Sequence, residues 1–116
     1  PLIKKHKGQI VFINSSAGLN AGPAWGAYSA TKAALKMVAD SLRAEVNPDG
    51  VRVMSVYPGR TASSMQNAIH RAEGKKYNPE RLLQPSDIAE MVVAALALPN
   101  TAEVTDLQIR PMMKPG

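Results

Sequence analysis

The pattern of apolar residues predicts three strands, and the first of them is a nearly continuous apolar run. Residues 9–14 read QIVFIN, residues 51–57 read VRVMSVY, and residues 104–109 read VTDLQI. β-Branched and aromatic side chains are frequent in the first two runs. Nearly continuous apolar runs of this length are typical of parallel sheets, in which both faces are covered.

Two longer segments between these runs have the periodicity of helices. Residues 25–47 contain abundant alanine and no proline, and residues 85–98 begin at a proline. Apolar residues recur at three- and four-residue steps in both segments, which predicts a core-facing side. The expected core faces comprise Leu35, Val38, Leu42 and Val46 in the first helix and Ile88, Met91, Val92, Ala95 and Leu96 in the second.

Residues 60–84 are polar and irregular, apart from a short helix expected near residues 64–72. A weakly patterned segment of this length within a compact domain is usually a functional loop. We therefore expect residues 60–84 to form an irregular lid over a binding site.

The alternation of strands and helices predicts an α/β fold. The connections are too long for hairpins, so we expect parallel strands joined by right-handed crossovers in a single domain over residues 1–116. In such sheets, ligands bind at the carboxyl ends of the strands. Those ends carry Asn14, Ser15 and Ser16 after the first strand and residues 58–61 after the second.

The composition excludes several kinds of site. The 116 residues include no cysteine, which excludes a disulfide scaffold and a thiolate metal site. Neither His6 nor His70 has a second histidine at ligand spacing, so we expect no metal site. The net charge of +5 is dispersed and aromatic residues make up only 4%, which argues against nucleic-acid binding.

The chain has no segment typical of membrane insertion or export. No stretch reaches the roughly 18 consecutive apolar residues of a spanning helix. The first residues, Pro-Leu-Ile-Lys-Lys, do not resemble a signal peptide, so we expect a cytoplasmic protein. The first residue is not methionine, which suggests a processed chain or a fragment of a longer one.

Tyr28 and Lys32 lie four residues apart, so they share one face of the expected helix. A phenol has a pKa of about 10 and is a poor acid or base near neutrality. A nearby ammonium stabilises the phenolate, which suits such a pair to proton transfer. Ser15, at the carboxyl end of the first strand, could donate a hydrogen bond to a carbonyl oxygen that gains negative charge. Taken singly, a lysine in such a position is usually a solvated residue of the helix surface, and a serine in such a position is usually an ordinary strand end.

Four stretches together resemble the short-chain dehydrogenase/reductase (SDR) family, and the resemblance covers residues 2–111. They are GQIVFINSSAG at 8–18, YSATK at 28–32, DSLRAE at 40–45 and VRVMSVYPG at 51–59. The resemblance implies a Rossmann-like, doubly wound parallel sheet. It also implies an NAD- or NADP-dependent oxidoreductase that interconverts an alcohol and a carbonyl compound.

The resemblance further implies roles for individual residues. Ser15 would hold the substrate carbonyl, and Tyr28 would donate or accept the proton. Lys32 would favour the phenolate and hydrogen-bond the nicotinamide ribose. In the family, the loop after a Pro-Gly pair holds the nicotinamide carboxamide. The residues that match this loop and its turn are Pro58, Gly59, Thr61 and Ser63, and the family more often has threonine in place of Ser63.

Some of these residues have other interpretations. A hydrolase pair of Ser15 with a histidine is disfavoured, because the chain has no G-x-S-x-G elbow. Arg60 could contact a phosphate or an acidic substrate, although a surface arginine is the simpler interpretation. Trp25 and Tyr57 could line a substrate pocket or pack in the core.

The chain lacks the dinucleotide-binding features of the family. Members are typically about twice this length, and their first half carries a glycine-rich turn that receives the pyrophosphate. Neither G-x-x-x-G-x-G nor G-x-G-x-x-G occurs in residues 1–116. We therefore expect the carboxyl-terminal half of a Rossmann-fold oxidoreductase, with the amino-terminal dinucleotide-binding half absent.

Two hypotheses account for this departure. In the first, the chain is a fragment of an enzyme that acts on a small-molecule alcohol or carbonyl substrate. In the second, it is a stand-alone non-catalytic chain that acts by association, or an inert remnant. One edge of the first strand would be unpaired, and an unpaired edge invites association with another chain. Alanines on several faces of the helix over residues 25–47 suit packing across the interface of a homo-oligomer.

Overall fold

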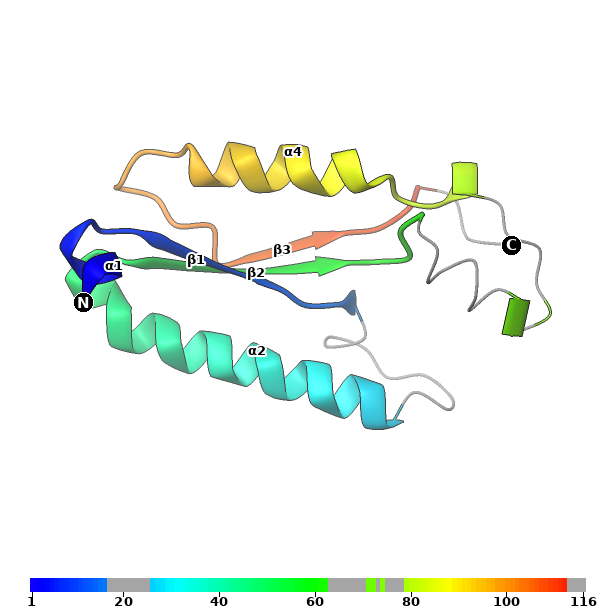
Figure 1. The fold of residues 1–116 in the computed structure, drawn as a ribbon, viewed down its shortest axis with the longest axis horizontal. Coiled ribbons are helices and arrows are strands. Elements are labelled where there is room, and N and C mark those ends of the chain that lie inside the picture. Colours follow the sequence, from blue (N-terminus) through cyan, green and yellow to red (C-terminus); the bar gives the residue numbers. More distant parts are fainter. Residues whose placement is uncertain (17–25, 63–70, 73, 75–78, 113–116) are drawn as a thin grey trace.

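A parallel three-stranded sheet lies between two long helices (Figure 1). In this computed structural model, the described residues are 1–16, 26–62, 71–72, 74 and 79–112. The expected α/β fold with a partial Rossmann-like sheet is confirmed. The expected short helix near residues 64–72 lies mostly outside the described residues.

The three strands lie where the apolar runs predict them. They are β1 (Gln9–Ile13), β2 (Arg52–Pro58) and β3 (Asp106–Ile109), in the spatial order β1-β2-β3. Both pairs are parallel, with Ile13 opposite Val56 and Ser55 opposite Asp106. Strand β2 is therefore central, and the carboxyl ends of all three strands meet at one edge of the sheet.

The helices begin and end at the signals present in the sequence. Helix α1 spans Leu2–Lys5, α2 spans Gly26–Val46 and α4 spans Pro85–Leu96, with short 3-10 turns at Asn47–Asp49 and Pro79–Arg81. Gly50 ends the turn after α2 with a φ of 79°, a left-handed conformation that glycine adopts without strain. A capping box formed by Gln84 and Asp87 begins α4.

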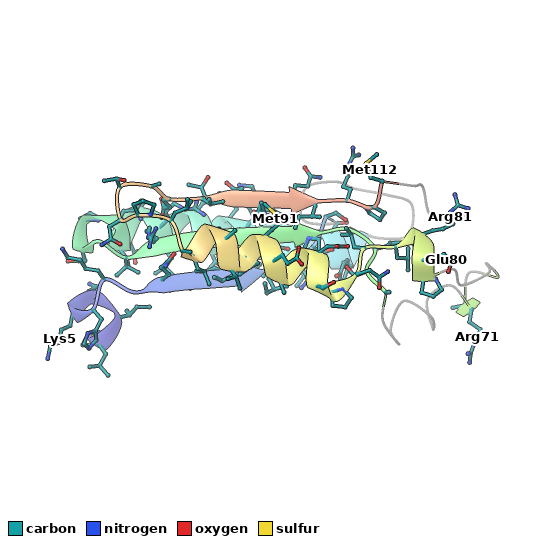
Figure 2. All side chains as sticks on the ribbon, turned by 90° about the horizontal axis from the view of Figure 1, so that it is seen from above. Lys5, Arg71, Glu80, Arg81, Met91 and Met112 are labelled. Atoms are coloured by element: carbon teal, nitrogen blue, oxygen red, sulfur yellow. The ribbon has the colours of Figure 1, made fainter. Side chains whose placement is uncertain are left out.

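Helices α2 and α4 cover opposite faces of the sheet. Figure 1 shows α4 above the sheet and α2 below it, and Figure 2 shows α4 in front of the strands. The hydrogen bonds agree, because Gln9 and Arg52 donate to the carbonyls of Leu96 and Leu98 at the end of α4. The order β1-β2-β3 means that both crossovers step in the same direction across the sheet. Because their helices lie on opposite faces, the two crossovers have opposite hands. The expectation that both are right-handed is wrong, because each helix goes to the face that the other leaves uncovered.

The apolar core lies between α2 and β2. Ala39 and Val46 of α2 pack with Val51 and Val53 of the β2 segment, and Leu42 packs against this cluster. The core face expected for α2 is wrong at one position, since Val38 is 57% exposed. Ala39 takes its place, because its small side chain lets the helix approach the sheet closely.

The face expected for α4 is less buried than its pattern predicts. Ile88, Val92, Ala95 and Leu96 are half-buried, Met91 is 47% exposed, and no residue of α4 is buried. Strand β1 likewise has no buried residue. Burial is therefore concentrated on β2, and the elements on either side of it retain accessible apolar surface.

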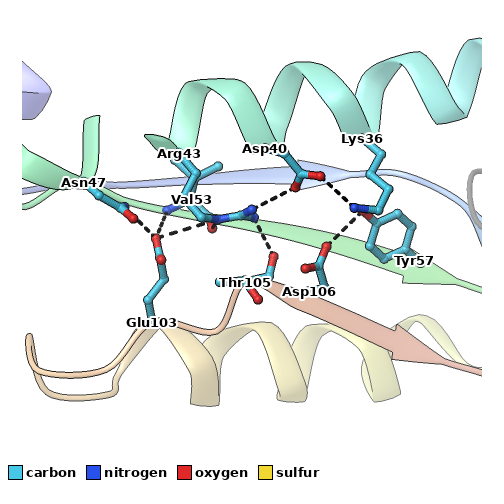
Figure 3. Close-up of polar contacts among 9 residues, drawn as sticks. All are labelled: Lys36, Asp40, Arg43, Asn47, Val53, Tyr57, Glu103, Thr105 and Asp106. Atoms are coloured by element: carbon cyan, nitrogen blue, oxygen red, sulfur yellow. Dashed lines mark hydrogen bonds and ion pairs between the residues drawn. The ribbon is translucent and has the colours of Figure 1, made fainter. Parts of the chain in front are cut away.

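A polar network joins α2 to the edge of β2 and to β3 (Figure 3). Arg43 of α2 donates to the carbonyl oxygens of Val53 and Thr105, at 2.9 and 2.7 Å, and to Asp40 at 2.8 Å. The Glu103 carboxylate accepts the backbone N–H of Val53 at 2.9 Å. These side chains satisfy the backbone of β2 at residues that precede the start of β3, where no strand partner is available.

Tyr57 belongs to this network and to the core. Its side chain is fully buried, and its hydroxyl donates to the carboxylate of Asp106 at 3.1 Å. Burial raises the pKa of Tyr57, because the phenolate would lose its hydration. Of the two interpretations open for Tyr57, core packing is the one that the structure supports.

Replacement of Val53 by alanine tests the position of the core. Val53 is fully buried, so Val53→Ala should lower the free energy of unfolding by about 2 kcal/mol, measured by urea denaturation. Val38→Ala removes the same atoms from an exposed site and should change it by less than about 0.5 kcal/mol. Equal effects of the two substitutions would contradict the packing described for α2.

Replacement of Asp40 by asparagine tests the ion pairs of the network. The hydrogen bond from Lys36, at 2.7 Å, and that from Arg43 hold the pKa of Asp40 below its ordinary value of 3.8. A lowered folded-state pKa stabilises the protein above the unfolded value, and this contribution disappears as the pH falls through the folded value. Asp40→Asn should therefore destabilise the protein at neutral pH and flatten the loss of stability below about pH 4. Parallel pH profiles of unfolding for the two proteins would contradict this role.

Candidate active site

The first part of the site lies just beyond the carboxyl end of β1. Asn14 follows the strand, and its backbone N–H donates to the carbonyl oxygen of Val56 at 2.7 Å. This bond continues the pairing of β1 with β2 by one residue. Asn14 is only 4% exposed and Ser15 is half-buried. Ser15 is thus held at the edge of the sheet where ligands bind in open α/β folds.

The second part of the site is the first half of α2. Tyr28 and Lys32 lie one turn apart on this helix, as their spacing predicts, and the Lys32 Nζ lies 5.7 Å from the centroid of the Tyr28 ring. A cation at this distance from an aromatic ring is attracted to its face. The side chain of Tyr28 is 51% exposed, so its hydroxyl is accessible to a small molecule.

The side-chain amide of Asn14 makes hydrogen bonds to both of these parts. The Asn14 side chain donates through Nδ2 to the carbonyl oxygen of Lys32 at 3.0 Å. Its Oδ1 accepts the backbone N–H of Ser15 at 2.8 Å. The sequence places Asn14 at the strand end but assigns it no role. A polar residue at the end of an otherwise apolar run was the available signal, since a buried amide requires hydrogen-bond partners.

The third part of the site is the turn after β2. Pro58 is the last residue of the strand, and the N–H of Gly59 donates to the carbonyl oxygen of Ile109 at 2.8 Å. The Thr61 hydroxyl donates to the carbonyl oxygen of Gly59 at 3.0 Å. Because β1 and β2 are paired in parallel, this turn lies at the same edge of the sheet as Ser15.

A short parallel bridge fixes the chain on either side of the expected lid. Thr61 pairs with Leu83. The Ala62 N–H donates to the Leu83 carbonyl oxygen at 2.8 Å, and the Leu83 N–H donates to the Arg60 carbonyl oxygen at 3.0 Å. Leu82 and Leu83 are both buried, at 6% exposure each. The two ends of the segment between Thr61 and Leu83 therefore lie side by side, next to the turn after β2.

Several predicted residues lie outside the described part of the chain. They are Ser63, Trp25, His70 and most of the lid. Arg60 is half-buried beside the turn, and its proposed contact with an acidic group stays a prediction. Among the described residues, no group of three or more histidine, aspartate or glutamate side chains could hold a metal ion. None of the described helices is long and apolar enough to cross a membrane.

Comparisons with known proteins match this chain to one family. The family model for short chain dehydrogenases matches residues 1–74. An uncharacterized short-chain type dehydrogenase/reductase of Sinorhizobium fredii is 33% identical over 113 residues, which cover 95% of this chain and 46% of the relative. The chain thus spans about half the length of this relative.

Solved structures show the same likeness. An alcohol dehydrogenase from the archaeon Thermococcus sibiricus, complexed with 5-hydroxy-NADP, is 26% identical with a TM-score of 0.78. The match covers 98% of this chain and 46% of that one. The closed form of a serine dehydrogenase complexed with NADP+ is 26% identical with a TM-score of 0.80, over 94% of this chain and 46% of that one.

Proposed function

The chain belongs to the short chain dehydrogenase family, and we propose that residues 1–116 supply the catalytic half of an NAD(P)-dependent oxidoreductase. The reaction would interconvert an alcohol and a carbonyl compound of a small-molecule substrate. The observation that supports this most is the hydrogen-bonded link from Ser15 through Asn14 to Lys32. It brings the serine of the strand end to the helix that carries Tyr28 and Lys32.

In the proposed reaction, a nicotinamide cofactor, when bound, would supply or accept the hydride at the substrate carbon. In the reductive direction, the Tyr28 hydroxyl gives its proton to the substrate oxygen, and in the oxidative direction the phenolate takes it back. The Lys32 ammonium, 5.7 Å from the centroid of the Tyr28 ring, places a positive charge beside this residue and offers a hydrogen-bond donor to the cofactor ribose. The Ser15 hydroxyl donates a hydrogen bond to the substrate oxygen as negative charge develops there.

The hydrogen-bond donors near the carboxyl ends of the strands fit the nicotinamide end of a dinucleotide. Lys32 and Tyr28 offer an ammonium and a hydroxyl to the ribose, and Thr61 offers a hydroxyl beside the Pro58-Gly59 turn. Ser63 would add a second hydroxyl to this cofactor-binding loop. The pyrophosphate end has no glycine-rich counterpart in this sequence. We infer that a second, dinucleotide-binding half completes the cofactor site.

The burial of β1 is consistent with such a second half. Within the described residues, β1 pairs only with β2, and Ile13 at its end is 56% exposed. Its free edge and half-covered faces suit the addition of further strands and a helix. A homo-oligomer, or a non-catalytic chain that associates through this edge, is the alternative that the same observation favours.

Replacement of Tyr28 by phenylalanine tests the proton-transfer step in a protein that contains both halves. Tyr28→Phe should lower carbonyl-dependent NAD(P)H oxidation at least about 100-fold, because it removes the acid without removing the ring. The assay uses NADH and NADPH with cyclohexanone, diacetyl and benzaldehyde as probes. Circular dichroism should be unchanged, since Tyr28 is half-exposed.

Tyr57→Phe is the matched control, because it deletes the same atom from a buried tyrosine that is bonded to Asp106. It should lower the free energy of unfolding by about 1 kcal/mol and leave the rate per folded molecule unchanged. Full activity of Tyr28→Phe would overturn the assignment of Tyr28 as the acid.

Calorimetric titration with NAD and NADP tests the division into halves. The two-half protein should bind one of the two cofactors at least about 100-fold more tightly than residues 1–116 alone, because pyrophosphate recognition is confined to the other half. Equal binding by both proteins would contradict the proposed division. Failure of both to bind either cofactor would favour the non-catalytic alternative.

A further inference from the structure

Among the described residues, the amino-terminal half of α2 contributes none to the apolar core cluster. The buried residues of this helix are Ser29, Ala39 and Val46, and the core cluster contains only the latter two. Tyr28 and Lys32 therefore lie on the part of the helix that the core does not fix. Their position relative to the strand ends requires another contact.

We propose that Asn14 is a positioning residue that sets Ser15 against the Tyr28–Lys32 turn of α2. This inference rests on the proposed function, because it concerns the alignment of the same three catalytic groups. It assigns a role to a residue that is neither an acid, a base nor a ligand of the substrate.

The backbone of Asn14 is fixed by the sheet. Its N–H donates to the carbonyl oxygen of Val56, a residue of the fully buried part of β2. The side chain is 4% exposed, so water does not compete effectively for its amide. The backbone of Asn14 is thus anchored to β2, the most buried of the described strands.

The side chain then makes two bonds that fix two catalytic segments at once. Nδ2 donates to the Lys32 carbonyl oxygen at 3.0 Å, and Oδ1 accepts the Ser15 N–H at 2.8 Å. An amide has a distinct donor end and acceptor end, so both bonds can form in only one orientation. The bond to Lys32 restrains this turn of α2 relative to the end of β1, and the bond to Ser15 restrains the backbone that carries its hydroxyl.

This alignment has a direct effect on the reaction. Successive residues of a helix rise by about 1.5 Å. A shift of α2 by less than one residue therefore displaces the Tyr28 hydroxyl by about as much as proton transfer to the substrate can tolerate. A misplacement of about 1 Å at a reacting group can cost about 100-fold in rate. Loss of the Asn14 bonds should therefore lower kcat while the folded state survives.

The other end of α2 offers a matched control. Asn47, just after the helix, donates through Nδ2 to the carbonyl oxygen of Val51 and to Glu103, both at 2.9 Å. It is an amide with the same kind of contacts at the opposite end of the helix. Asn47→Ala should lower stability without a change in kcat.

The experiment measures kcat and cofactor Kd in the two-half protein, with the probe carbonyl compounds and NAD(P)H named above. Asn14→Ala should lower kcat about 10- to 100-fold with the cofactor Kd changed less than about 3-fold. In a Ser15→Ala background, the same substitution should lower kcat at least about 3-fold less than it does in the wild-type background, because the part of its effect that acts through Ser15 is already lost while the part that acts through α2 remains. Additive effects of the two substitutions would overturn the inference while the proposed function stands. A wild-type rate for Ser15→Ala would overturn the proposed function and the inference with it.

Amide hydrogen exchange supplies a readout that does not depend on activity. Without the Oδ1 acceptor, exchange at the Ser15 N–H should accelerate at least about 10-fold in Asn14→Ala and remain unchanged in Asn47→Ala. If Asn14→Ala fails to fold, Asn14→Asp keeps the acceptor for Ser15 and loses the donor to Lys32. Asn14→Asp should then retain slow exchange at Ser15 and still lose kcat. Unchanged Ser15 exchange in Asn14→Ala, or full kcat in Asn14→Asp, would overturn the inference.

Discussion

The burial of β2 is the constraint on which the rest of the structure depends. A strand that is paired on both edges and covered on both faces is mostly apolar, and Val53, Val56 and Tyr57 of β2 are fully buried. The two faces need two separate covers, which α2 and α4 provide from opposite sides (Figure 1). The strands run in parallel on either side of β2, so their carboxyl ends come to one edge, where the proposed catalytic groups lie.

Polar side chains form hydrogen bonds with the backbone of β2 where β3 does not pair with it. Strand β3 begins at Asp106, too late to pair with Val53, and the guanidinium of Arg43 and the carboxylate of Glu103 satisfy that residue instead. Lys36, Asp40, Arg43 and Asn47 recur at three- and four-residue steps along α2, and Figure 3 shows Arg43 of this set bonded to the backbone of Val53 and Thr105. The periodicity of the sequence predicts which face of α2 is polar. The pairing of β2 decides whether the polar side chains on that face find hydrogen-bond partners in the sheet.

The sequence predicts the strands, the helices and the family well, because each depends on local patterns. The apolar runs mark β1 and β2, and the Pro-Asp-Gly stretch after α2 marks its end. The face of α2 is less predictable, since Val38 and Ala39 both fit a helical period and only the distance to the sheet favours Ala39. The hand of the crossovers is likewise not local, because it depends on which face of the sheet is already covered.

The candidate site combines both kinds of information. The spacing of Tyr28 and Lys32 follows from one helical turn and is readable from the sequence. The approach of Ser15 to that turn depends on Asn14, which lies 18 residues before Lys32 and is recognisable only once the fold brings them together. Apolar packing holds the carboxyl-terminal half of α2, and such packing is non-directional, so it tolerates small shifts. A buried amide with two directional hydrogen bonds does not. An active site that needs alignment within a fraction of an ångström is better held by the second kind of contact, and the proposed catalytic end of α2 is the end at which a polar contact, from Asn14, is present and the apolar core cluster is not.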